Sequence, residues 1–265
     1  MKLLVCDLDG TLYPKKSESS ELQFQNNVKA VQKWVEKGNK FAVATARGLH
    51  HYSVLTEKLG LEVEFIGCNG AMVRLDTGEE ILKEFPCSVF IDLCKFVKEN
   101  NINASVATGI GDEWVWSGYE KYPRGVEVYD SLRDVISIAD LDAIDPTLGT
   151  VRIQIFTPPE NRDILKGMII DRNYPVTVTT SDHDMVDIGP LESSKGISIM
   201  ELCQKYGITE NNLIVAGDSE NDIPMFEITK HSYCINHAEP EVLMRASKVV
   251  ESVAELIEME LEKEN

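Results

Sequence analysis

The sequence has few cysteines, a deficit of positive charge and no long apolar run. Its six cysteines are scattered without a C-x-x-C pair, which favours buried thiols over a disulfide or zinc framework. A formal net charge of −18 at pH 7 argues against a basic surface for nucleic acid or anionic membranes. No apolar run approaches the roughly 20 residues of a membrane span, and no signal-peptide core follows the first methionine. We therefore expect a cytoplasmic protein without nucleic-acid or membrane partners.

What the chain does contain is enough apolar material for a packed core. It has 265 residues, 43% of them apolar, which suits two domains or one domain with a large insertion. Apolar strand patterns at residues 3–6, 41–45, 64–67 and 213–216 alternate with amphipathic helix patterns. This alternation predicts right-handed βαβ units and a parallel, Rossmann-like α/β sheet. Ligands collect at the carboxyl ends of the strands in such sheets.

The middle of the chain has a different pattern. A hairpin signal stands at residues 76–79, and the strands and helices beyond it no longer alternate regularly. We therefore predict an inserted α+β domain over residues 85–185. Residues 1–84 and 186–265 would together form the α/β core.

Two acidic residues follow the first strand. Asp7 and Asp9 lie two positions apart, so they share one side if the extended geometry persists. Clustered carboxylates repel each other and need a proton or a cation, and Mg²⁺ prefers such oxygen ligands. Taken alone, Asp7 is equally well explained as a turn or helix-cap residue.

Further polar residues stand at other element ends. Thr45 follows the second strand, Asn69 follows the third, and Lys195 opens a predicted helix. The run Gly217–Asp222 follows the strand at 213–216. Singly, each residue is more often structural than catalytic. Together they bring acids, a hydroxyl, a lysine and an amide to one set of termini, which favours a chemical site.

The same residues carry a family resemblance. Asp7-Leu8-Asp9-Gly10-Thr11 resembles motif I of the haloacid dehalogenase (HAD) superfamily, and Thr45 resembles motif II. Lys195-Gly196 is similar to motif III, and Gly217–Asp222 matches the GDxxND form of motif IV. The insertion between motifs II and III resembles the type IIB cap of Cof-like phosphatases. Such a cap closes over the site and favours small substrates.

The resemblance implies covalent phosphoryl transfer. Asp7 would attack the phosphate ester and form an aspartyl-phosphate. Asp9 would protonate the leaving alcohol and then act as a base on the hydrolytic water. Magnesium would be held by Asp7, the backbone carbonyl of Asp9, and Asp218.

The remaining motif residues would hold the phosphate. The resemblance assigns its charge to Thr45, Lys195 and the backbone at Ala46. Asn221 would help to bind the phosphate or would position Lys195. Asp222 would orient Lys195 or a metal-bound water.

The sequence departs from the family pattern at several positions, including Ala46, Gly48 and His237. Ala46 replaces the usual glycine of motif II, which reduces freedom at positive φ. His237 stands where relatives often have a Gly-Asn-Ala-like run, and no role follows for it from the sequence.

The function expected is a Mg²⁺-dependent phosphatase of small phosphorylated metabolites, with sugar phosphates foremost. A phosphomutase of the same superfamily and a catalytically idle phosphometabolite-binding regulator are the alternatives. The sequence predicts no oligomeric state.

Overall fold

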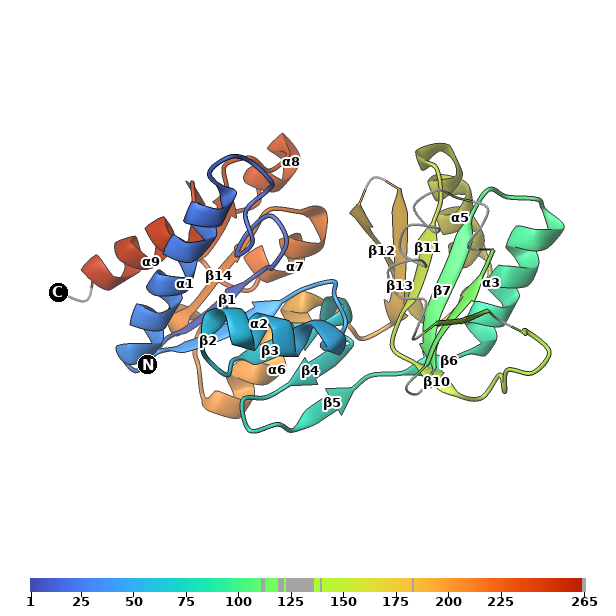
Figure 1. The fold of residues 1–265 in the computed structure, drawn as a ribbon, viewed down its shortest axis with the longest axis horizontal. Coiled ribbons are helices and arrows are strands. Elements are labelled where there is room, and N and C mark those ends of the chain that lie inside the picture. The colour runs from blue at the N-terminus through green and yellow to red at the C-terminus, as the bar shows by residue number, and fades with distance from the viewer. Residues whose placement is uncertain (111–112, 119–121, 123–135, 139, 183, 264–265) are drawn as a thin grey trace. The chain divides into compact units, whose positions relative to one another are not determined.

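The computed structural model describes residues 1–110, 113–118, 122, 136–138, 140–182 and 184–263. The chain divides into two compact units (Figure 1). The first, here called the core unit, comprises Met1–Leu82 and Ser193–Asn265, and the inserted unit comprises Lys83–Glu192. None of the helices in the described part of the chain is long and apolar enough to span a membrane.

The core unit is built on an eight-stranded sheet in the order β16-β15-β14-β1-β2-β3-β4-β5. The pairs from β16 to β3 are parallel, and β3, β4 and β5 pair antiparallel. The predicted parallel α/β fold is therefore confirmed, with a hairpin added at one edge. The strands are β1 (Leu3–Cys6), β2 (Lys40–Ala44), β3 (Glu64–Gly67), β4 (Met72–Arg74), β5 (Glu80–Leu82), β14 (Leu213–Gly217), β15 (Ser232–Ile235) and β16 (Lys248–Val250).

Helices cover both faces of this sheet (Figure 1). Side chains of α1, α2 and α9 share one hydrophobic cluster with the sheet, and those of α6, α7 and α8 share another. The helices are α1 (Ser20–Glu36), α2 (Tyr52–Leu59), α6 (Lys195–Tyr206), α7 (Ile223–Phe226), α8 (Pro240–Leu243) and α9 (Val253–Glu262). Short 3₁₀ turns are η1 (Leu49–His51), η2 (Cys68–Gly70), η4 (Glu210–Asn212) and η5 (Glu220–Asp222).

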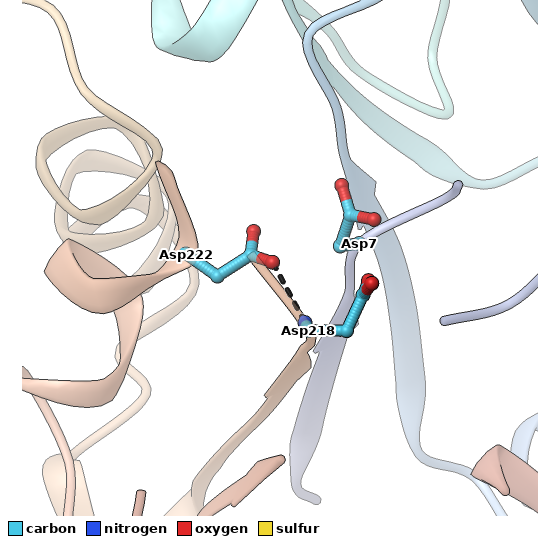
Figure 2. Close-up of side chains that lie close together, drawn as sticks. All are labelled: Asp7, Asp218 and Asp222. Atoms are coloured by element: carbon cyan, nitrogen blue, oxygen red, sulfur yellow. Dashed lines mark hydrogen bonds between the residues drawn. The ribbon is translucent and has the colours of Figure 1, made fainter. Parts of the chain in front are cut away.

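The strand order brings three sequence-distant termini together. Because β14, β1 and β2 are neighbours and run parallel, their carboxyl ends meet at one edge of the sheet. Asp7 follows β1, Thr45 follows β2, and Asp218 follows β14. Figure 2 shows Asp7 and Asp218 at this edge, with Asp222 beside them.

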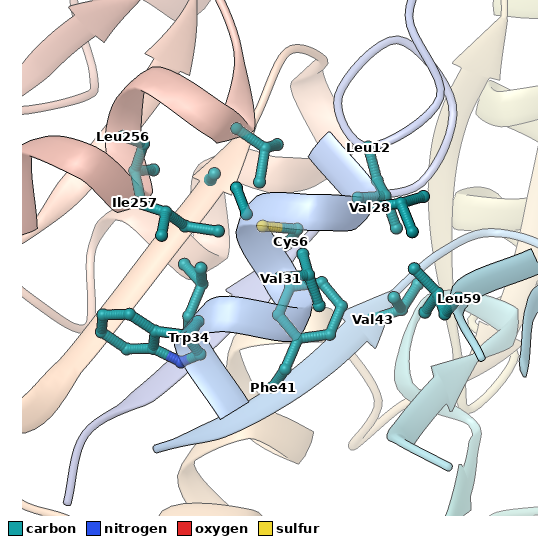
Figure 3. Close-up of a cluster of buried hydrophobic side chains, with 14 of the residues drawn as sticks. Cys6, Leu12, Val28, Val31, Trp34, Phe41, Val43, Leu59, Leu256 and Ile257 are labelled. Carbon is teal, nitrogen blue, oxygen red and sulfur yellow. The ribbon is translucent and has the colours of Figure 1, made fainter. Parts of the chain in front are cut away.

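Burial on both faces explains why strand β1 is apolar at every position. Leu4 and Cys6 of β1 point into the cluster under α1 and α9, and Leu3 and Val5 point into the opposite one. Side chains alternate along a strand, so a strand covered on both faces must be apolar at every position. Figure 3 shows the first cluster, in which Trp34 of α1 is fully buried.

The inserted unit has a six-stranded sheet in the order β12-β13-β11-β7-β8-β9 and a small β10–β6 pair. Buried side chains of α3 and α5 pack against the larger sheet. Its elements are β6 (Phe85–Pro86), α3 (Ser88–Glu99), β7 (Ser105–Ile110), β8 (Glu113–Ser117), β9 (Ile136–Ile138), β10 (Gly149–Thr150), β11 (Ile153–Phe156), α5 (Pro159–Asp171), β12 (Val176–Asp182) and β13 (Met185–Pro190).

The expected domain boundary at residues 185 and 186 needs adjustment. Strand Met185–Pro190 pairs with β11 and β12, so it belongs to the inserted unit rather than to the core. Residues 123–135 of the expected insertion lie outside the described residues.

Candidate active site

Asp7 is placed by the first strand and the turn that follows it. Its backbone N–H donates to Ala216 O at 2.8 Å, which continues the β1–β14 ladder to the strand end. Gly10 then turns the chain with φ +92°, and a Cβ at this position would lie 2.3 Å from Asp218 Oδ2. The motif therefore needs glycine both for its backbone conformation and for the close approach of the Asp218 carboxylate.

Lys195 bridges two carboxylates inside the protein. Its Nζ donates to Asp7 Oδ1 and to Asp222 Oδ1, each at 2.6 Å, and its side chain has no exposed surface. Burial opposes the charged form, but the charges of Asp222 and Asp7 raise the pKa of Lys195 above its ordinary value. Lys195 is therefore a charged ammonium group.

The position of Lys195 is set by the start of α6. Ser194 caps the helix because its Oγ accepts from the Ile197 N–H at 3.1 Å, so Lys195 is the first helical residue. A cation is unfavourable at the positive end of a helix dipole. The two carboxylates offset this cost, so the ion pairs with Asp7 and Asp222 account for a lysine at this position.

Asp218 accepts hydrogen bonds at both oxygens. Thr11 Oγ1 donates to Oδ1 at 2.8 Å, and His237 Nε2 lies 3.2 Å from Oδ2. Burial, followed by the charge of Asp222, raises the pKa of Asp218, and the hydrogen bonds of Thr11 and His237 oppose the shift. His237, for which no role was predicted, is thus a neighbour of this carboxylate.

Asp222 organises the loop after β14. Its Oδ2 accepts from the backbone N–H groups of Asp218 at 2.9 Å and Ser219 at 3.0 Å, and its Oδ1 accepts from Lys195 (Figure 2 draws the Asp218 bond). Ser219 and Asp222 form a capping box at the start of η5. These three bonds engage both oxygens of Asp222, so Asp222 is suited to support a metal site by holding Asp218 and Lys195 in place.

The residues at this edge fit a hard divalent cation. Asp7, Asp218 and Asp222 are buried, and one carboxylate oxygen from each lies within 4.8 Å of the others. Burial raises the pKa of Asp7, the charge of Lys195 opposes the rise, and Asp222 and Asp218 add to it. Three acids and one lysine leave excess negative charge, which a cation with oxygen ligands would neutralise.

Asp9 lies apart from this acidic cluster. Its carboxylate is held by Arg47, with Nε to Oδ2 at 2.7 Å and Nη2 to Oδ1 at 2.5 Å, and half of its side chain is exposed. The backbone N–H of Arg47 also donates to Thr45 Oγ1 at 3.1 Å. Ala46 between them is not among the described residues with positive φ, so the missing glycine imposes no backbone strain there.

Asn221 contacts the loop after the third strand. Its Nδ2 donates to Asn69 Oδ1 at 3.0 Å. Asn69 stands at the end of a predicted strand, but no role was predicted for it. Thr11 and Arg47 lie within or beside motifs I and II, so their positions were a signal, whereas His237 was marked only by its departure from the family pattern.

A comparison with family models identifies the class of protein. Residues 4–256 match the model of the haloacid dehalogenase-like hydrolases. The chain belongs to this family, and the resemblance drawn from its four motifs is confirmed.

Individual relatives match along nearly the whole chain. A 5-amino-6-(5-phospho-D-ribitylamino)uracil phosphatase of Bacillus subtilis is 21% identical, covering 95% of this chain and 93% of its own. The pyridoxal phosphate phosphatase of Escherichia coli is 23% identical, covering 97% of both chains. These relatives confirm the predicted enzyme class, a phosphatase.

Solved structures confirm the fold. A HAD/COF-like hydrolase from Plasmodium vivax has a TM-score of 0.80 at 20% identity, covering 99% of this chain and 96% of its own. A HAD subclass IIB sugar phosphatase has a TM-score of 0.76 at 18% identity, covering 100% of this chain and 98% of its own. The predicted α/β core with a type IIB inserted domain agrees with both.

Proposed function

We propose that this chain is a Mg²⁺-dependent phosphatase that hydrolyses small phosphorylated metabolites through an aspartyl-phosphate on Asp7. The observation that carries the proposal is the position of the Asp7 carboxylate. Lys195 holds Oδ1, and among the described residues no hydrogen bond is made to Oδ2. A carboxylate fixed at one oxygen and open at the other is suited to in-line attack on phosphorus.

The charge around Asp7 suits a phosphoryl group. We assign the metal to Asp7 and Asp218, with the backbone carbonyl of Asp9 as a further ligand, and Asp222 as the residue that fixes Asp218 and Lys195. When bound, a divalent ion reduces repulsion between the Asp7 carboxylate and the phosphate. Lys195 faces the same space and would stabilise negative charge on the transferred group.

Thr45, the backbone at Ala46 and Asn221 complete the proposed phosphate site. Thr45 is buried at the end of β2, and its hydroxyl oxygen accepts from the Arg47 N–H. Its hydroxyl proton is therefore available to donate to a phosphate oxygen. The amide of Asn221 would donate to another phosphate oxygen.

Asp9 is assigned as the general acid and base. Both of its oxygens accept from the Arg47 guanidinium, and we expect it to leave this pair when it transfers a proton to the leaving oxygen. An arriving phosphate offers Arg47 an alternative acceptor that can also take two parallel N–H hydrogen bonds. We therefore expect substrate binding to release Asp9 for proton transfer.

The substrate class rests on the relatives. Those described above act, by their names, on pyridoxal phosphate, a phosphoribityl compound and sugar phosphates. All are monoesters of small molecules, and we place sugar phosphates first. Selectivity among them is assigned to the inserted unit, as the type IIB resemblance implies.

The test is hydrolysis of p-nitrophenyl phosphate with Mg²⁺ or with EDTA. We expect turnover only with the metal and its loss in Asp7→Asn. Asp163→Asn is the matched control, because the side chain of Asp163 is 83% exposed in the inserted unit, and it should retain turnover. Turnover by Asp7→Asn at the level of the unchanged protein would contradict the covalent mechanism.

Two further measurements separate the alternatives. Release of phosphate that carries label from ¹⁸O-water supports hydrolysis, whereas transfer to a second substrate without label would indicate a mutase. Binding of phosphorylated metabolites without turnover would indicate a regulator. A screen of phosphorylated metabolites, with free phosphate as the readout, then identifies the substrate.

A further inference from the structure

The turn after β3 has an unusual backbone. Cys68 and Asn69 adopt φ 49° and φ 53°, two consecutive non-glycine residues in the left-handed region. The other described non-glycine residues with positive φ are Asn101 and Asn173. A left-handed conformation costs an L-residue roughly 1–2 kcal/mol, and asparagine tolerates it better than most. Such a turn persists only when its surroundings hold it in place.

One set of contacts ties the turn to the loop after β2. The backbone N–H of Cys68 donates to Arg47 O at 2.9 Å, and that of Asn69 donates to Thr45 O at 3.0 Å. The turn therefore fixes the backbone of the residue whose hydroxyl we assign to the phosphate.

A second set ties the turn to the start of α6. Ser198 Oγ donates to Gly70 O at 2.8 Å. Gly70 has φ +101°, and a Cβ at this position would lie 2.3 Å from Ser194 O. The turn thus packs directly against the residue that caps the helix bearing Lys195.

The third contact is made by the Asn69 side chain. Its Oδ1 accepts from Asn221 Nδ2 at 3.0 Å, across 152 positions of sequence. Asn221 Oδ1 is buried and accepts no hydrogen bond from a described residue. Among the described residues, the Asn221 amide is therefore held by its contact with Asn69 alone. Asn69 Oδ1 can only accept a hydrogen bond, so it orients the Asn221 amide with Nδ2 toward Asn69.

We propose that Asn69 is a positioning residue for the phosphate site, an assignment that rests on the proposed function. Its carbonyl oxygen holds the Asn221 amide so that the remaining N–H of Nδ2 faces the phosphoryl group. Its backbone holds Thr45 at the same time. The left-handed backbone at residue 69 is what lets one residue reach both partners.

The test is a double-mutant cycle on the binding of inorganic phosphate with Mg²⁺ present, measured by calorimetry. Asn69→Gly removes the amide but retains the left-handed backbone, so the fold should be preserved. We expect it to weaken phosphate binding about five- to tenfold, a loss of the order of one hydrogen bond. In an Asn221→Ala background the same substitution should change binding less than about twofold, because its partner is already absent.

The control is Asn173→Gly, which makes the same substitution at φ 51° after α5 of the inserted unit. It should leave phosphate binding unchanged. An equal effect of Asn69→Gly in both backgrounds, no effect in either, or no phosphate binding by the unchanged chain would each overturn the assignment of Asn69.

Turnover is measured separately on the same proteins. Coupled phosphate binding without hydrolysis of p-nitrophenyl phosphate would overturn the proposed function and support the role of Asn69 in binding. Hydrolysis by the unchanged chain with additive effects in the cycle would overturn only the role of Asn69.

Discussion

Replacing Lys195 with methionine should strongly destabilise the core unit. The ammonium group lies 2.6 Å from a carboxylate oxygen of both Asp7 and Asp222, and the exposed fractions of the three side chains are 0%, 8% and 0%. Methionine is of similar length, so little cavity forms and the main effect is the loss of the cation. Removing one partner from a buried ionic cluster costs about 3–5 kcal/mol in the free energy of unfolding.

The matched control is Lys205→Met in the same helix. Lys205 forms an ion pair with Glu79 at 3.0 Å, but its side chain is 43% exposed and that of Glu79 is 55% exposed. Water and salt screen such a pair, so its loss should change stability by at most about 1 kcal/mol. The difference between the two variants isolates the effect of burial.

Urea unfolding in EDTA, followed by tryptophan fluorescence, measures both variants. Trp34 is buried in the core unit, whereas Trp114 and Trp116 lie in β8 of the inserted unit. A background carrying Trp114→Phe and Trp116→Phe therefore makes the fluorescence report on the core unit, which is needed because two units can unfold separately.

Two further measurements test the electrostatic origin of the loss. Adding Asp7→Asn to Lys195→Met should recover about 1–2 kcal/mol, because one uncompensated charge is removed. The loss should also be smaller at pH 5 than at pH 8, since burial raises the pKa of Asp7 and protonation removes its charge. The reasoning would be refuted if Lys195→Met at pH 8 lost no more stability than Lys205→Met. It would also be refuted if adding Asp7→Asn to Lys195→Met recovered no stability.

Two other predictions concern Asp218 and its neighbour. Burial raises the pKa of Asp218 in the folded protein. Asp218 therefore contributes its full stabilisation below the ordinary carboxyl pKa of about 3.9, where it is protonated in both states. This stabilisation is lost as the pH rises through the raised pKa. In EDTA, Asp218→Asn should therefore gain stability relative to the unchanged protein between pH 4 and pH 8 in urea unfolding, and a relative loss would contradict this sign. His237→Ala should weaken Mg²⁺ binding about tenfold in calorimetry, because the Asp218 carboxylate loses a hydrogen-bond donor. His237→Asn, which retains an N–H donor, should bind Mg²⁺ more tightly than His237→Ala, and equal binding would contradict a positioning role.

Much of the core architecture could be read from local patterns. Buried strands such as Leu3–Cys6 are apolar at every position, and each is followed by a helix pattern, so the parallel sheet was predictable. The start of α6 at Lys195 was also predictable, because caps act within a few residues. The limit of the inserted unit was placed too early, since strand pairing and not local composition assigns Met185–Pro190.

What the sequence by itself determined about the site is its set of strand-end residues. Asp7, Thr45 and Asp218 each follow an apolar run, and the carboxyl ends of parallel strands share one edge of a sheet. This reasoning needs only local pattern and the general geometry of parallel sheets. Local pattern alone therefore predicts both the place of the site and its chemistry.

Only the tertiary structure decided how the carboxylates and amides are paired. Arg47 holds Asp9 across 38 positions, His237 lies beside Asp218 across 19, and Asn69 holds Asn221 across 152. Such contacts depend on strand order and on the exact paths of the loops, which no local pattern encodes. The two acids of the first motif differ for this reason: Asp7 is buried against Lys195, and Asp9 is turned outward to Arg47.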